Sequence, residues 1–124
     1  VSFDTTDPNT VYVASVAPDS TKNHLWRSTD FGASWTALDR TASQSSNGLP
    51  AGVPVNTIAN DPNNTTTLYA GTHLGVYRSL DSGANWERFG GGMPLVNVTD
   101  LYLSPSNGRV RAATFGRGFW EAQR

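Results

Sequence analysis

The stretch that decides the fold is Arg27-Ser28-Thr29-Asp30-Phe31-Gly32-Ala33-Ser34-Trp35, because it recurs as Arg78-Ser79-Leu80-Asp81-Ser82-Gly83-Ala84-Asn85-Trp86. Six of the nine positions are identical, and they share the pattern Ser-x-Asp-x-Gly-x-x-Trp. We call residues 28–35 and 79–86 the two Asp turns. A repeat at such a distance indicates an architecture of stacked, similar units.

Each position of an Asp turn has a physical reason to be there. The Asp side chain accepts hydrogen bonds from backbone N–H groups of its own turn. The Ser hydroxyl closes a second local bond, and Gly supplies a positive φ. The Trp returns over the hairpin and buries its apolar face against it. We therefore predict structural roles for Ser28, Asp30, Gly32, Trp35, Ser79, Asp81, Gly83 and Trp86.

Other landmarks repeat around the Asp turns and define a unit of four strands. Apolar segments at 11–14, 68–71 and 111–114 follow Asp-Pro or Ser-Pro turns, and they precede aromatic segments at 25–27, 76–78 and 119–121. We predict strands at 1–6, 10–16, 24–29 and 34–38, then at 55–60, 67–72, 75–80 and 85–89, and finally at 98–103, 109–114 and 118–122. No segment has a helical period of apolar residues, so we expect almost no helix.

The fold class that follows is all-β, with about three four-stranded antiparallel β-propeller blades. The predicted units are 1–54, a blade with a long loop, then 55–97, a second blade, and 98–124, an incomplete blade without an outer strand. Propellers close with four to eight blades. We therefore expect the chain to be part of a larger propeller, or to assemble into one with a second copy.

Composition excludes several classes of function. The formal net charge is −1 and the nine basic residues are scattered, which argues against a nucleic-acid partner. No apolar run approaches a membrane span. The chain has no Cys, and His24 and His73 are isolated, so we predict no metal site and no cofactor. A Cys-free, Lys-poor chain rich in Ser, Thr and Asn favours a secreted or periplasmic bacterial protein.

The Asp turns resemble the BNR or Asp-box repeat of bacterial sialidases, xyloglucanases, sortilin-type receptors and photosystem II assembly factor propellers. Residues 114–121 resemble the last blade of secreted bacterial members. The resemblance implies a propeller that serves either as a glycosidase or as a binding protein, because one fold carries both. The sialidase Arg-Ile-Pro signature and Tyr-Glu pair are absent, and no position matches a catalytic Asp of the xyloglucanases. No catalytic residue is therefore assigned.

Ligand binding is expected on one face of the predicted arc. The second-to-third strand loops and the connections between blades share that face, and blade one carries long insertions there, at 17–23 and 39–54. The candidate ligand-binding residues in these loops are Asp39, Arg40, His73, Phe115 and Arg117. An ordinary exposed loop residue is the competing interpretation for each of them.

Two functions remain open. The first is a non-catalytic segment of an exported Asp-box propeller related to glycoside hydrolases, so that any enzymatic activity would be a glycosidase activity of the parent propeller. The alternative is a ligand-binding or scaffold propeller without enzymatic activity. The expected partners are a glycan or protein ligand, together with the remaining blades or a second copy of the chain.

Overall fold

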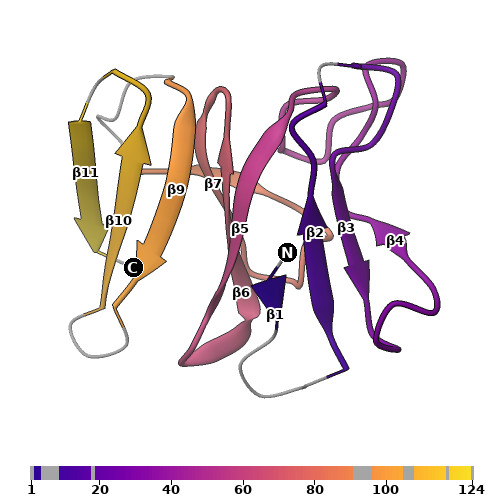
Figure 1. Ribbon diagram of the computed structural model, residues 1–124, viewed down its shortest axis with the longest axis horizontal. Helices are drawn as coiled ribbons and strands as arrows, with labels where there is room; N and C mark the ends of the chain where they lie inside the picture. The colour runs from indigo at the N-terminus through magenta and orange to yellow at the C-terminus, as the bar shows by residue number, and fades with distance from the viewer. Residues whose placement is uncertain are drawn as a thin grey trace.

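The computed structural model describes residues 2–3, 9–17, 19–90, 96–104, 108–116 and 118–123. All regular elements of these residues are strands, which form three antiparallel sheets (Figure 1). The described part of the chain contains no helix that could cross a membrane. The all-β prediction is confirmed.

We call the three sheets blades 1, 2 and 3. Blade 1 contains β1 (Ser2–Phe3), β2 (Val11–Ala14), β3 (Leu25–Ser28) and β4 (Thr36–Ala37). Blade 2 contains β5 (Val55–Asp61), β6 (Asn64–Thr72), β7 (Gly75–Ser79) and β8 (Glu87–Phe89). Blade 3 contains β9 (Val98–Leu103), β10 (Arg109–Thr114) and β11 (Gly118–Gln123). In each sheet, neighbouring strands follow one another in sequence.

The blades stand side by side in chain order, with blade 1 at the right of Figure 1 and blade 3 at the left. The first strand of blade 2, β5, contacts β1 and β2 of blade 1 and β9 of blade 3. Connections after the second and fourth strands of a blade lie together, and we call their end of the arc the loop face. The Asp turns lie at the opposite end, which we call the turn face.

Blade 2 is covered on both of its faces, because successive residues of a strand point to opposite sides. Leu68 and Ala70 of β6 belong to a core cluster shared with blade 1. Tyr69 lies between them in sequence and belongs to a second cluster shared with blade 3. This double burial explains the continuous apolar run in β6, which a strand with one solvated face would not need.

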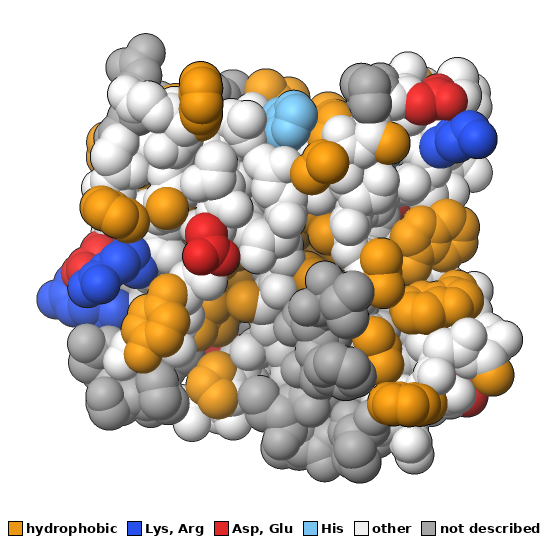
Figure 2. Space-filling view, in the orientation of Figure 1, with side chains coloured by type: hydrophobic (Ala, Val, Ile, Leu, Met, Phe, Trp, Pro, Cys, Tyr) orange, Lys and Arg blue, Asp and Glu red, His pale blue; other side chains and the backbone are white. Residues whose placement is uncertain are grey.

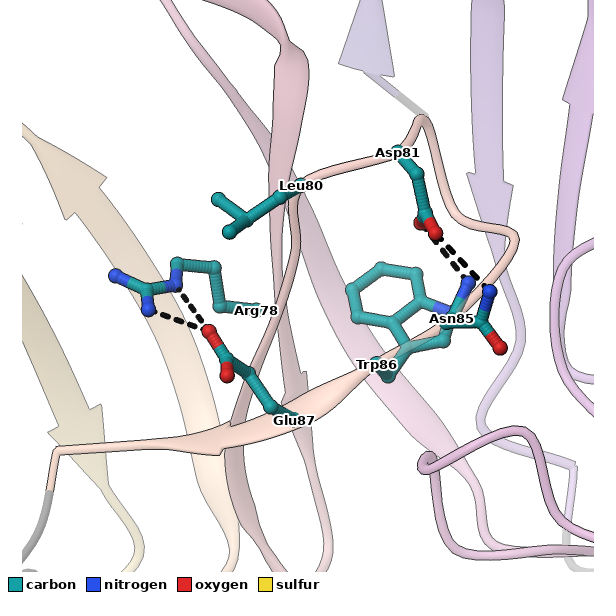
Figure 3. Close-up of a pocket in the computed structure, with 6 residues that line it drawn as sticks. All are labelled: Arg78, Leu80, Asp81, Asn85, Trp86 and Glu87. Atoms are coloured by element: carbon teal, nitrogen blue, oxygen red, sulfur yellow. Dashed lines mark hydrogen bonds and ion pairs between the residues drawn. The ribbon is translucent and has the colours of Figure 1, made fainter.

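The hydrogen bonds of the two Asp turns match each other, and Figure 3 shows those between Asp81 and Asn85 in the second turn. In the second turn, Oδ1 of Asp81 accepts from the backbone N–H of Asn85 at 2.9 Å and from the Ser79 hydroxyl at 2.8 Å. Oγ of Ser79 accepts from the backbone N–H of Gly83 at 2.8 Å. These are the hydrogen bonds expected from the sequence for Ser and Asp, and φ is +96° at Gly83.

Hydrogen bonding shifts the acidity of both turn carboxyls. The Ser34 side chain, then Ser28 and the Ser34 backbone, lower the pKa of Asp30 to about 2. The Asn85 backbone and side chain and the Ser79 hydroxyl lower the pKa of Asp81 to about 2. Donors that favour the ionised form explain both shifts.

The two turn tryptophans differ in burial. Trp86 is 6% exposed, and its indole N–H donates to the carbonyls of Leu38 at 3.2 Å and Gly83 at 3.1 Å. Trp35 is 41% exposed. Trp35 is therefore not buried as expected from the sequence, because the preceding blade adds cover to Trp86 beyond the contact with its own turn.

Replacing Trp86 with alanine is expected to lower the free energy of unfolding by about 3–5 kcal/mol, because a buried indole and its hydrogen bonds are lost together. Trp35→Ala is the matched control and is expected to cost about 1 kcal/mol or less, because its ring is already partly solvated. Urea denaturation followed by far-ultraviolet circular dichroism measures both values. Equal losses in the two variants would contradict this account of the blade interface.

The Asp turns also predict how stability responds to acid. A carboxyl whose folded pKa is about 2 and whose ordinary value is 3.8 stabilises the fold above pH 4, and this contribution is lost as the pH falls from 4 towards 2. The double variant Asp30→Asn, Asp81→Asn should therefore lose stability less steeply than the unmodified chain over this range. Urea titrations at pH 4, 3 and 2 give the two slopes, and parallel slopes would refute the assignment.

Candidate functional site

The two long loops of blade 1 are hydrogen-bonded to each other on the loop face. The backbone N–H of Ala42 donates to the carbonyl of Ser20 at 2.9 Å. The Asn23 side chain donates to the carbonyl of Asp39 at 3.0 Å. The insertions at 17–23 and 39–54 therefore form one composite structure, in which neither loop extends alone into solvent.

The carboxylate of Asp39 holds this composite together from inside. One of its oxygens accepts from the Asn23 side chain at 3.0 Å and the backbone N–H of Leu25 at 3.3 Å, and the other accepts from the backbone N–H of His24 at 2.8 Å. Asp39 is only 1% exposed. Three N–H donors therefore compensate the burial of its charge.

His24 is buried beside the same carboxylate. Its Nδ1 lies 3.6 Å from Oδ2 of Asp39, and its Nε2 lies 2.6 Å from the carbonyl oxygen of Ala17. Since a carbonyl only accepts, Nε2 carries a hydrogen. The imidazole of His24 therefore bonds to the loop after β2, and its backbone N–H donates to the carboxylate of Asp39 that follows β4.

Asp39, which the sequence suggested as a ligand contact, is placed inside the protein and not on its surface. The reason is the antiparallel pairing of β3 with β4, which brings the residue before β3 next to the residues after β4. His24 and Asp39 occupy those two positions. Hairpin geometry was the signal that could have linked them.

Residues 47–49 of loop 39–54 pack between blades 1 and 2. Leu49 belongs to the core cluster between these blades. The Asn47 side chain donates to the backbone carbonyl of Leu38 at 2.9 Å. The backbone carbonyl of Asn47 accepts from the backbone N–H of Trp86 at 2.8 Å. A Cβ on Gly48 would lie 1.8 Å from the Trp86 carbonyl oxygen, so only glycine fits there. The length of this loop therefore serves packing.

Two of the other candidates, His73 and Phe115, occupy equivalent positions in successive blades. Each follows a Thr whose hydroxyl donates across the strand turn, from Thr72 to Gly75 at 2.9 Å and from Thr114 to Gly118 at 2.8 Å. Strand register places Val16 of blade 1 at the same position, one residue after Ser15. We call Val16, His73 and Phe115 the loop-face row.

Backbone hydrogen bonds fix the row to the connections between blades. The N–H of His73 donates to the carbonyl of Pro54 at 3.3 Å, and the N–H of Phe115 donates to that of Asn97 at 2.9 Å. Phe115 is 78% exposed, Val16 is exposed and His73 is half-buried. The row therefore presents side chains to solvent from an anchored backbone, which suits surface contact.

The remaining candidates do not join the row. Arg40 is half-buried, donates to the carbonyl of Asp39 at 3.1 Å, and lines an outer groove of about 470 Å³ with Arg27 and the second Asp turn. Arg117 lies outside the described residues. Sequence reasoning found His73 and Phe115 separately and missed Val16, because their equivalence depends on strand register.

Carboxylates are sparse on the loop face. Among the described residues of its loops, Asp19 is the exposed acid, and Thr21 hydrogen bonds lower its pKa. Asp100, also exposed, is on β9 in blade 3, with blade 2 between it and Asp19. No group of three or more potential metal ligands occurs within the described residues.

Comparison with known proteins identifies solved structures with a similar fold. No family model and no curated protein matches the chain. A GH74 xyloglucanase from Xanthomonas campestris is similar in structure, with a TM-score of 0.69 and 18% identity over 96% of this chain and 20% of that enzyme. An ancestral GH74 enzyme has a TM-score of 0.65 and 23% identity over 91% of this chain and 16% of its own.

A third similar structure is the GH74 enzyme of Niastella koreensis, with a TM-score of 0.55 and 22% identity over 87% of this chain and 16% of that enzyme. The chain thus spans about a fifth or less of these three enzymes. These likenesses, together with the three sheets, show the fold of part of a β-propeller.

The buried carboxylate yields a prediction for the loop composite. Asp39→Ala leaves three N–H donors without their acceptor, so the free energy of unfolding should fall by about 2–4 kcal/mol. Asp19→Ala, in the neighbouring exposed loop, should change it by about 0.5 kcal/mol or less. Thermal and urea denaturation of both variants provide the comparison. A stable Asp39→Ala protein would mean that the carboxylate does not hold the loops.

Proposed function

We propose that this chain is a non-catalytic segment of an exported Asp-box propeller related to carbohydrate-active proteins, and that the loop-face row contacts glycan. The row carries the proposal, because three successive blades place side chains at the same register position on the face where the loops meet. An aromatic ring among polar loops suits stacking against a sugar face.

The structural likeness to GH74 enzymes supports the carbohydrate class, since one of them is a xyloglucanase. The Asp turns support the Asp-box family, because their hydrogen bonds are the same in both copies. Membership of the family and an exported location are both part of the proposal. Xyloglucan, a β-linked glucan, is the first ligand to test.

The carboxylate arrangement favours a segment without its own catalytic pair. Hydrolysis of a glycosidic bond requires two carboxyl groups about 5–10 Å apart across the substrate. Asp39 already accepts three hydrogen bonds inside the loop composite. Asp19 and Asp100 belong to blades 1 and 3, so catalysis in the parent propeller would draw on other blades.

A scaffold that binds protein is the alternative function. It is favoured by the exposed apolar side chains of the loop face, which are Val16 at 59%, Leu74 at 39% and Phe115 at 78%. Exposed apolar side chains on an anchored backbone are typical of protein contact surfaces. A peptide or protein ligand would use the same face.

Titration with a xyloglucan heptasaccharide tests the leading function. Amide resonances of residues 15–17, 72–75 and 114–116 should shift, and those of the turn face should stay in place. Phe115→Ala should weaken binding by roughly three- to tenfold, the amount that an aromatic contact contributes. Reducing-sugar release from xyloglucan should remain at background.

Phe31→Ala is the matched control, since Phe31 is similarly exposed, at 67%, but lies in the first Asp turn at the other end of the arc. Its affinity for the heptasaccharide should be unchanged. Equal weakening by both variants, or no shift on the loop face at saturating sugar, would reject glycan contact by the row. Measurable hydrolysis would reject the non-catalytic assignment.

A further inference from the structure

The outer groove between blades 1 and 2 has a volume of about 470 Å³ and is lined from both blades. Blade 1 contributes Arg27 and Thr36, and the connection after β4 contributes Arg40. The second Asp turn contributes Asp81 and Ser82. Both arginines are half-buried. The groove therefore brings two guanidinium groups from different elements to one concave surface.

The two arginines of the groove have backbone carbonyls as partners. Nη1 of Arg27 donates to the carbonyl of Ser82 at 3.0 Å, and Nη1 of Arg40 donates to the carbonyl of Asp39 at 3.1 Å. The ion pairs among the described residues include neither Arg27 nor Arg40. A guanidinium group has five N–H donors, so each arginine keeps donors for a ligand.

The matching position of blade 2 has the acidic partner that this position lacks. Register pairs Arg27 with Thr36 between β3 and β4. The same register pairs Arg78 with Glu87 between β7 and β8. In Figure 3 the Arg78 guanidinium turns to the Glu87 carboxylate, which accepts from its Nε at 2.9 Å. Blade 1 has a threonine in place of that carboxylate, so a carboxylate of a ligand can take its place beside Arg27.

The arginines of blade 3 also have an acidic partner. Basic and acidic side chains gather together over blade 3 at the left of Figure 2. There Arg111 lies 2.7 Å and Arg109 lies 3.6 Å from the carboxylate of Glu121. Such exposed pairs stabilise the fold little, but they occupy the donors that an external anion would need. Arg27 and Arg40 differ from them in being open to an anion.

Asp81 limits the charge that the groove accepts. Hydrogen bonds from Asn85 and Ser79 lower its pKa to about 2, so it is ionised at neutral pH. The described lining therefore carries two positive charges and one negative charge. A ligand with a single negative charge balances them, whereas a doubly charged anion leaves excess negative charge beside Asp81.

Two hydroxyl groups add to the polar lining. Within the described residues, the side chains of Thr36 and Ser82 make no hydrogen bond. Thr36 is exposed and Ser82 is half-buried. The small side chains of Ala37 and Ala84 line the same groove and leave room for a ring-sized molecule. The lining thus suits a ligand that carries hydroxyl groups as well as a carboxylate.

We propose that the outer groove binds the carboxylate of an acidic sugar, a compact molecule with one negative charge and several hydroxyl groups. The carboxylate accepts N–H donors from Arg27 and Arg40. The sugar hydroxyls bond to Thr36 and Ser82. None of these residues belongs to the loop-face row, so the proposal holds whether or not the row contacts neutral glycan.

Titration with D-glucuronate tests the proposal. NMR follows the side-chain Nε–H groups of Arg27 and Arg40, together with the amides of 36–40 and 81–84. D-glucose is the uncharged comparison and sulfate the doubly charged one. Glucuronate should shift these signals and glucose should leave them in place. Sulfate should bind at least roughly threefold more weakly than glucuronate, because of the charge of Asp81.

Substitutions in the groove locate the binding. Thr36→Glu gives blade 1 the carboxylate that blade 2 has in Glu87, and should weaken glucuronate binding by roughly tenfold or more. Thr36→Gln, of equal size and without charge, should change the affinity by less than about threefold. Arg40→Gln tests the contact independently and should weaken binding by roughly tenfold. Arg109→Gln removes the same charge from blade 3 and should have no effect.

Four results would overturn the proposal. Glucuronate causes no shift in the groove at roughly 50 mM. Glucose or sulfate binds there as tightly as glucuronate. The Glu and Gln variants of Thr36 bind glucuronate equally well, or Arg40→Gln binds it as the unmodified chain does. The N-acetyl α-amide of glutamate, a singly charged carboxylate without hydroxyl groups, binds at least as tightly, which would assign the groove to an acidic peptide.

Discussion

The contact between Trp86 and the carbonyl of Leu38 is the constraint on which the arc depends. It joins two sheets whose described strands do not pair with each other, and the indole fills space between them. A buried ring with a satisfied N–H provides both apolar area and a fixed direction. Gly83 allows it, because a Cβ there would lie 2.8 Å from the Leu38 side chain.

The Asp turns support that contact indirectly, by shaping the hairpin that carries the Trp. Their carboxylates and hydroxyls bond only to their own turns, so they shape the hairpin that delivers the Trp to the neighbouring blade. This explains why the two Asp turns have matching hydrogen bonds while Trp35 and Trp86 differ in burial. A turn motif can place a side chain, and only a neighbouring sheet can cover it.

On the opposite face, loop length and ligand binding are separate properties. In and next to the long loops of blade 1, the side chains of His24, Asp39 and Leu49 are buried. Short turns in the other blades carry His73 and Phe115 to the surface. An insertion is visible in sequence, but the direction in which its side chains point depends on hydrogen-bonding partners that are far away in the chain.

The sequence by itself determined the strands, the turn chemistry and the number of units, because these depend on local periodicity and on residues a few positions apart. It did not determine the environment of Asp39, the equivalence of Val16 with Phe115, or the exposure of Trp35. These depend on register between strands and on which sheet face meets another, and only the tertiary structure fixes those relations. The same Ser-x-Asp-x-Gly-x-x-Trp pattern therefore produces a core residue in blade 2 and an exposed residue in blade 1.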